Sequence, residues 1–389
     1  MRQSLNLTDV KKNNQRLVLD AVFQRGVTTR SQLAKELSLS KPAISDNLQH
    51  LLDLGIVQEA GEGEAGSAGG RKAILLRFAP AHKLIVSVNL NFSNPVFVLG
   101  DLNGDVINSF DISIADGISI QDCMNLVFSS IRVLMRSVGS AADIYCIAVA
   151  APGAFTRDGD LASFNTACGG PAWWQVDLKH QLTEAFHLPV IIYNDVNAST
   201  LGEWLQGNGT LGDDLLYMSV GLGLGAGLIL NGKPFLGSGC NAGEIYDYID
   251  TSLPGGGQLE DTVCIKYLRE QCAAHPLSPF SSEDTPTCSE IVALYDQGNT
   301  AVAETVDDIC RRLAIISYNL MNFLSLPQVI FGGEYAPFSD CFRRHLATLY
   351  ENSTRPMPGI HRTALGKLAG TTGMFYLARQ QYFDEICSR

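Results

Sequence analysis

The apolar positions of the first eighty residues recur every three or four residues in three successive segments, which predicts three short helices. The first helix covers Asn13–Arg25, where Leu17, Ala21 and Val22 form one apolar stripe, and it ends at Gly26.

The second and third helices carry clear start signals. Thr29 is an N-cap with Gln32 three residues later, the pattern of a capping box, and Ser40 is an N-cap followed by Pro42 in the first turn. Their predicted buried faces are Leu33, Ala34 and Leu37 in the second helix, and Ile44, Leu48, Leu51 and Leu52 in the third. The segment between them is short enough for a tight turn.

Two apolar strands follow the helices and complete the head. They are predicted at Gly55–Gln58 and Arg71–Phe78, and the Gly- and Ala-rich loop Glu59–Gly70 joins them. Three helices and a two-stranded wing indicate a winged helix-turn-helix, whose third helix reads the major groove while the wing reaches the minor groove or backbone. The expected DNA contacts are Lys41, Pro42, Ala43, Ser45, Asn47 and Gln49 on the helix, and Gly70, Arg71 and Lys72 on the wing.

A three-helix module that binds protein rather than DNA is the alternative for this head. Asp46 is a departure from a DNA reader, because an acid on the reading helix repels phosphate, although it could accept from a cytosine amino group.

The pattern changes after Ala79–Ala81, which predicts one domain at 1–80 and a second at 81–389. Buried strands and helices alternate there, which favours α/β layers with binding groups at the strand ends. The expected strands are 84–90, 95–99, 106–114, 144–151, 190–193, 215–220 and 329–333, and the clearest helices are 120–137 and 198–205.

Charge divides at the same boundary. The 389 residues carry a formal net charge of −12, yet residues 1–80 are net +3 and the remainder is net −15. A basic head on an acidic body fits DNA binding by the head alone. The ten cysteines form no C-x-x-C pair, and the sequence has neither a signal-peptide pattern nor a membrane-spanning apolar run, so we expect buried thiols in a cytoplasmic protein without membrane contact.

Several segments of the body resemble the ROK family (repressors, open reading frames and sugar kinases). They are Ile147–Gly153, Tyr193–Glu203, Leu216–Gly232, Gly243-Glu244 and Phe331–Gly333, and the similarity extends over nearly all of residues 83–389. The resemblance implies a two-lobed, actin-like ATPase fold. Together with the winged head, the chain is similar to the repressor branch, which includes xylose and N-acetylglucosamine repressors.

Candidate sugar contacts follow from the strand ends and from this resemblance. Asp195 comes directly after a buried strand, where a carboxylate accepts a sugar hydroxyl or its proton, and Asn194 beside it both donates and accepts. The resemblance adds Glu244 and Glu260, with Asn165 as a further candidate. The alternative is that Asn194 and Asp195 only cap the following helix.

The phosphate and zinc motifs of the family's kinases depart from the pattern. Its D-x-G-G-T motif would fall at Asn89–Ser93, which reads NLNFS, and Leu222 replaces the usual hydroxyl residue in the glycine-rich loop Gly221–Gly227. Asp247 stands where the family has a zinc-binding histidine, and the cysteine motif that should follow is absent from the sequence, so we expect Asp247 at most to contact sugar.

The leading hypothesis is therefore a DNA-binding regulator, most simply a repressor, that needs no cofactor or metal. Its expected partners are a double-stranded operator with an inverted repeat, a small carbohydrate effector, and further copies of itself in a homodimer or dimer of dimers. The alternatives are an ATP-dependent sugar kinase and a DNA-binding regulator whose body responds to a phosphosugar or a protein.

Overall fold

The computed structural model describes residues 7–63, 72–90, 94–115, 117–138, 143–156, 158–164, 171–209, 213–250, 256–280, 286–351 and 353–388. Three of the candidate contacts, Gly70, Arg71 and Asn165, lie outside these residues. So do residues 91–93 of the expected phosphate loop and residues 253–255 of the expected zinc loop.

The head is a winged helix-turn-helix. Its elements are α1 (Leu7–Arg25), β1 (Val27–Thr28), α2 (Arg30–Leu37), α3 (Lys41–Asp53), β2 (Val57–Glu62) and β3 (Ile74–Phe78), with an antiparallel sheet of order β1-β3-β2. Both expected caps are present: the hydroxyl of Thr29 accepts from the backbone N–H of Gln32, and that of Ser40 from Ala43. The prediction that Leu17 belongs to the apolar stripe of the first helix is wrong, because Leu17 is 42% exposed while its neighbours Val18 and Leu19 are buried.

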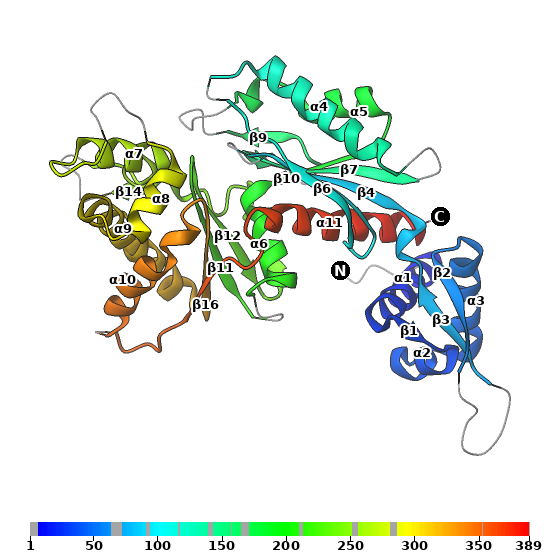
Figure 1. Ribbon diagram of the computed structural model, residues 1–389. Coiled ribbons are helices and arrows are strands. Elements are labelled where there is room, and N and C mark those ends of the chain that lie inside the picture. Colours follow the sequence, from blue (N-terminus) through cyan, green and yellow to red (C-terminus); the bar gives the residue numbers. More distant parts are fainter. Residues whose placement is uncertain are drawn as a thin grey trace.

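The body has two lobes, each built on a five-stranded sheet (Figure 1). The N-terminal lobe has the strand order β10-β7-β4-β5-β6, in which β4 pairs in parallel with β7 and antiparallel with β5. Its elements are β4 (Leu84–Asn89), β5 (Val96–Asp101), β6 (Val106–Asp111), α4 (Ile120–Arg136), β7 (Ile144–Ala151), α5 (Leu178–Phe186) and β10 (Val190–Asn194). The strand expected at 144–151 is confirmed to the residue.

The C-terminal lobe has the strand order β13-β12-β11-β16-β17. Its strands are β11 (Leu215–Val220), β12 (Leu224–Leu230), β13 (Lys233–Pro234), β16 (Gln328–Gly333) and β17 (Gly359–Arg362). Four helices cover one side of it: α7 (Ile265–Ala274), α8 (Cys288–Asp296), α9 (Thr300–Leu324) and α10 (Ser339–Glu351). Their apolar side chains and those of the sheet form one core.

Helices α6 (Asp195–Gln206) and α11 (Ala369–Ile386) cross between the lobes at backbone contact (Figure 1). A Cβ added to Gly202 would lie 2.1 Å from the carbonyl oxygen of Ala369, and one added to Gly373 would lie 2.0 Å from that of Ala198. Only glycine permits so close an approach at these two positions. The sequence predicted helix α6 at Ala198–Leu205, so its start was placed three residues too late.

The head shares its hydrophobic core with the N-terminal lobe and α11. Phe23 of α1, Phe78 of β3 and Phe383 of α11 form a three-ring cluster with centroids 5.1 to 5.8 Å apart. Arg16 pairs with Asp384 and also covers the Phe383 ring. The far end of α11 is thereby fixed to the head (Figure 1).

Within the described residues, no helix is both long enough and apolar enough to cross a membrane.

Candidate functional site

A cavity of about 290 Å³ lies where the strand ends of the two lobes meet α6. Its walls come from the ends of β4, β7, β10, β11 and β16, from the glycine-rich turn after β11, and from the segment around Gly243-Glu244. The cavity therefore sits at the edge where an α/β fold places its ligands.

Asn194 and Asp195 enter this cavity from the start of α6. Asn194 is the N-cap: its side-chain oxygen accepts from the N–H of Asn197 at 2.8 Å, and its amide donates to the carbonyl of Gly153 at 3.0 Å. The Asp195 carboxylate accepts from the N–H of Val196 at 2.9 Å. Asn194 thus does act as a helix cap, as the alternative interpretation held, yet both side chains also line the cavity.

Glu244 and Glu260 face the same space from the C-terminal lobe. Glu260 is buried, and its carboxylate accepts from the N–H of Leu224 at 3.0 Å. Burial raises the pKa of Asp195 to about 6, while burial and then the charges of Asp195 and Glu260 raise the pKa of Glu244 to about 7. The three acids line one cavity, and their carboxylate oxygens can accept hydrogen bonds from hydroxyl groups.

Asp247, in contrast, does not line the cavity. The short 3-10 helix Ile245–Asp247 turns its side chain outward, where it is exposed and accepts from the amide of Gln258 at 2.5 Å. The structure thus brings four of the sequence-predicted sugar residues together, leaves Asp247 outside, and does not describe Asn165.

The expected phosphate side of the cavity is lined by Asn89 and Leu222. Asn89 is buried at the end of β4, and its side-chain oxygen has no hydrogen-bond partner among the described residues. Leu222 packs against the core of the C-terminal lobe. An amide and an apolar side chain occupy the positions where the resemblance would place an acid and a hydroxyl.

Several lining residues were not found from the sequence. Ser199 is one helical turn after Asp195, so the spacing of four residues was a usable signal. Tyr246, Glu334 and Lys367 also line the cavity, and Lys367 pairs with Asp111 at the end of β6.

Glu203 holds the loop that carries Lys367. This fully buried carboxylate at the end of α6 accepts from the N–H groups of Ala364 and Leu365 and from the hydroxyl of Thr363. It thereby connects α6 to the segment that leads from β17 into α11.

The reading face of the head is the exposed side of α3. Lys41, Pro42, Ser45 and Gln49 are exposed, and Ala43 is partly so. The prediction that Asn47 contacts DNA is wrong. Asn47 is only 6% exposed, and its amide donates to the carbonyl of Ala43 at 2.7 Å, so it lies on the inner side of the helix.

On the wing, Lys72 is exposed and pairs loosely with Glu62 at 3.4 Å. An ion pair between two exposed side chains is weak, so the ammonium group of Lys72 stays accessible to a phosphate group.

Comparisons with known proteins agree with this architecture. Residues 97–381 match the model of the ROK family, and residues 13–59 match that of the arsR family of bacterial regulatory proteins. A xylose repressor from Caldicellulosiruptor bescii is 27% identical over 357 residues, which is 88% of each chain.

Solved structures show the same fold. One of a ROK family transcriptional regulator, described as a homologue of the E. coli MLC protein, matches with a TM-score of 0.77 and 22% identity, over 97% of this chain and 98% of that one. A ROK family glucokinase from Streptomyces griseus, in complex with glucose and AMPPNP, matches with a TM-score of 0.64 and 20% identity, over 76% of this chain and 99% of that one. The family match spans most of the body, and the chain belongs to the ROK family.

Proposed function

We propose that this chain is a DNA-binding transcriptional repressor of carbohydrate-utilisation genes, and that a small sugar bound in the cavity changes its affinity for the operator. One observation carries the proposal: a winged helix-turn-helix is fixed to the far end of α11, and the near end of α11 packs on the helix that begins at Asp195.

The DNA contacts of the proposal lie on the head. Lys41, Pro42, Ala43, Ser45 and Gln49 of α3 would enter the major groove, and Lys72, together with Gly70 and Arg71, would follow the neighbouring backbone or minor groove. The net charge of +3 on residues 1–80 is small, so useful affinity requires two heads. A homodimer or dimer of dimers on an inverted repeat supplies them.

The effector of the proposal is a small neutral carbohydrate. Carboxylates accept hydroxyl hydrogen bonds without needing a positive charge on the ligand, and Asn194, Asp195, Glu244 and Glu260 provide such acceptors around one cavity. Xylose is the first sugar to test, because relatives of this chain are named xylose repressors.

The geometry also supplies a route from cavity to head. Asp195 is the first residue of α6, α6 touches α11 through backbone at Gly202 and Gly373, and α11 ends against Phe23 of the head. A ligand that prefers one arrangement of the lobes shifts the population of that arrangement, and with it the position of the heads.

A sugar kinase is the second candidate, and one observation favours it: the raised pKa of Asp195, about 6, suits a general base. Phosphoryl transfer depends on charge neutralisation around the phosphates, and Asn89 and Leu222 offer neither an acid for magnesium nor a hydroxyl. We therefore infer that the body binds sugar without phosphorylating it. Steady ADP release with any of the common pentoses, hexoses or amino sugars would reverse this inference.

The experiment that tests the proposal uses duplexes selected from a random pool by the protein itself. Fluorescence anisotropy then measures operator affinity with and without xylose, glucose and N-acetylglucosamine. An effective sugar should weaken binding at least about tenfold, which is the usual size of an allosteric coupling. Asp195→Asn should keep the sugar-free affinity and lose the response, whereas the exposed neighbour of Glu260, changed as Asp261→Asn, should keep both.

An Asp195→Asn protein that responds to sugar like the wild type would refute the assigned role of the cavity. A wild type that selects no duplex would refute DNA binding itself.

A further inference from the structure

Asp307, Cys341 and His345 bring three metal-ligating side chains together between α9 and α10, and none of the three lines the cavity. One ligand atom from each of them lies within 4.8 Å of the other two. Cys341 and His345 are one helical turn apart on α10, and Asp307 faces them from α9. We propose that these three side chains form a binding site for a divalent transition-metal ion of the Zn²⁺ type.

The distances from the Asp307 carboxylate to the other two ligand atoms are compatible with that ion. Cys341 Sγ lies 3.6 Å from the Asp307 carboxylate, and a tetrahedral Zn²⁺ with ordinary bond lengths separates such an S–O pair by about 3.6 Å. His345 Nε2 lies 2.9 Å from the same carboxylate and would have to move out by about 0.5 Å for the same geometry. A rotation of the partly exposed His345 ring that moves Nε2 by about half an ångström is a small adjustment.

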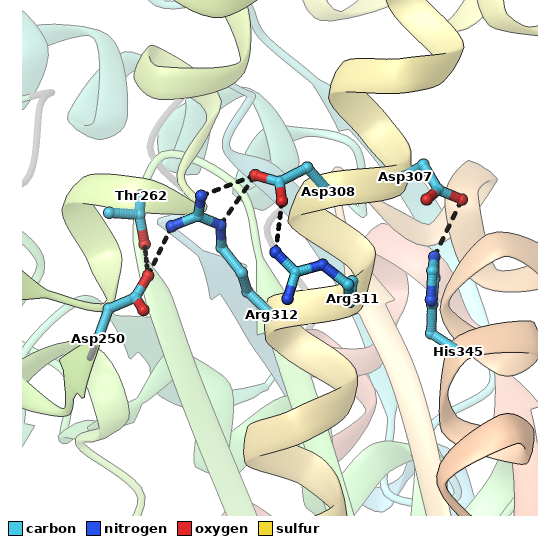
Figure 2. A network of polar contacts seen from close by, with 7 residues as sticks. All are labelled: Asp250, Thr262, Asp307, Asp308, Arg311, Arg312 and His345. Atoms are coloured by element: carbon cyan, nitrogen blue, oxygen red, sulfur yellow. Dashed lines mark hydrogen bonds and ion pairs between the residues drawn. The ribbon is translucent and has the colours of Figure 1, made fainter. Parts of the chain in front are cut away.

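His345 gives an independent indication of a ligand. Its Nε2 is buried and lies 2.9 Å from the Asp307 carboxylate, in the ion pair drawn in Figure 2. This contact lacks hydrogen-bond geometry, so the atom has an ion-pair partner but no hydrogen bond among the described residues. A buried polar atom without a hydrogen bond is costly, and a metal ion would satisfy it.

Asp307 is not held by the arginines of α9 that hold the neighbouring Asp308. Asp308 is held by Arg311 at 2.6 Å and by Arg312 at 2.7 and 2.9 Å, and Arg312 continues to Asp250 (Figure 2). Asp307, one residue earlier and therefore about 100° around the helix, points away from that network toward α10. The two acids thus serve different partners.

The mixed oxygen, nitrogen and sulfur donor set selects the class of ion. A thiolate and an imidazole suit Zn²⁺ and its chemical neighbours and are poor ligands for Mg²⁺ or Ca²⁺. Asp307 is partly exposed while Cys341 is buried, so the ion would enter from the Asp307 side and keep its fourth position for water.

One cation already competes for this position. The guanidinium of Arg344 lies 3.3 Å from Cys341 Sγ and 3.5 Å from Asp307, although its side chain is 70% exposed. A bound ion would displace it into solvent. This contact yields a test in the opposite direction, because Arg344→Gln should bind the metal more tightly than the wild type.

Titration of the full-length reduced protein with Co²⁺ is the direct test. We expect one Co²⁺ per chain, a thiolate-to-metal charge-transfer band, and displacement of Co²⁺ by Zn²⁺. Cys341→Ser should abolish the band and His345→Gln should weaken binding at least tenfold, and Zn²⁺ should raise the melting temperature of the wild type but not of these variants. Circular dichroism confirms that each variant is folded.

Matched controls lie elsewhere in the same lobe. Cys240→Ser, His275→Gln and the exposed Asp296→Asn remove one residue of each type outside the cluster and should leave the titration unchanged. If the wild type shows no saturable Co²⁺ binding at micromolar concentration, or if Cys341→Ser and His345→Gln bind like the wild type, the site does not exist.

Discussion

Replacing Glu244 by glutamine tests whether the three cavity acids are held together at an energetic cost. Burial and the charges of Asp195 and Glu260 raise the pKa of Glu244 from 4.5 to about 7. Because the raised pKa belongs to the folded state, the fold keeps this proton between about pH 4.5 and 7, where the unfolded chain has lost it. The stability that this proton contributes is complete below pH 4.5 and is lost as the pH rises through 7.

The magnitude follows from the size of the shift. At 1.36 kcal/mol per pKa unit, ionising Glu244 in the fold costs about 3 kcal/mol of unfolding free energy at pH 8. Glu244→Gln cannot ionise, so we expect it to be about as stable as the wild type at pH 5 and up to about 3 kcal/mol more stable at pH 8. Part of the pH dependence should persist, because burial alone raises the pKa of Asp195.

Urea unfolding at several pH values measures this difference. Trp173, Trp174 and Trp204 all belong to the body, so tryptophan fluorescence reports its unfolding rather than that of the head. Glu270→Gln, at an exposed position on α7, is the matched control and should follow the wild type at every pH. If the curves for Glu244→Gln and the wild type stay parallel from pH 5 to pH 8, the pKa of Glu244 is not raised in the fold as described.

Three further substitutions probe other parts of the structure. Gly373→Ala would place a Cβ 2.0 Å from the carbonyl oxygen of Ala198 and should lower stability by about 1–3 kcal/mol in thermal unfolding, so an unchanged melting temperature would contradict the close helix crossing. Glu203→Gln removes a charged acceptor from Leu365 and its neighbours and should cost about 1.5–3 kcal/mol in urea unfolding; a loss below the error of the measurement would exclude this anchoring role. Lys41→Ala should weaken binding to all duplexes about equally and reduce the salt dependence by about one ion, whereas a sequence-selective loss would mean that Lys41 contacts a base.

Most of the helices and strands could be predicted from the sequence because the spacing of apolar residues within each of them is a local pattern. The strand 144–151 is apolar along its whole length between Asp143 and Pro152-Gly153, and the structure has it with the same bounds. Asn47 was wrongly predicted to contact DNA, although its spacing indicated a buried position. It lies three residues after Ile44 and four before Leu51, on the buried face of α3.

The roles of other residues depend on contacts that no local pattern contains. Glu203 accepts from residues about 160 positions away, and the outward turn of Asp247 is set by the 3-10 helix that follows Glu244. The metal-ligating cluster likewise joins Asp307 to residues on a different helix. Long-range packing, not propensity, decides such positions, so a single sequence is silent about them.

The crossing of α6 and α11 bears directly on how the proposed repressor would respond to sugar. The cavity draws Asp195 from the start of α6 and Glu244 and Glu260 from the other lobe, so a ligand that touches both sides favours one relation between the lobes. At Gly202 and Gly373 the two helices meet without side chains between them. No side chain can therefore change its rotamer at these contacts to accommodate a displacement of α6. The displacement would instead pass along α11 to the aromatic cluster that holds the head. A repressor of this design needs no contact between ligand and DNA, because one rigid helix would connect the sugar cavity to the reading head.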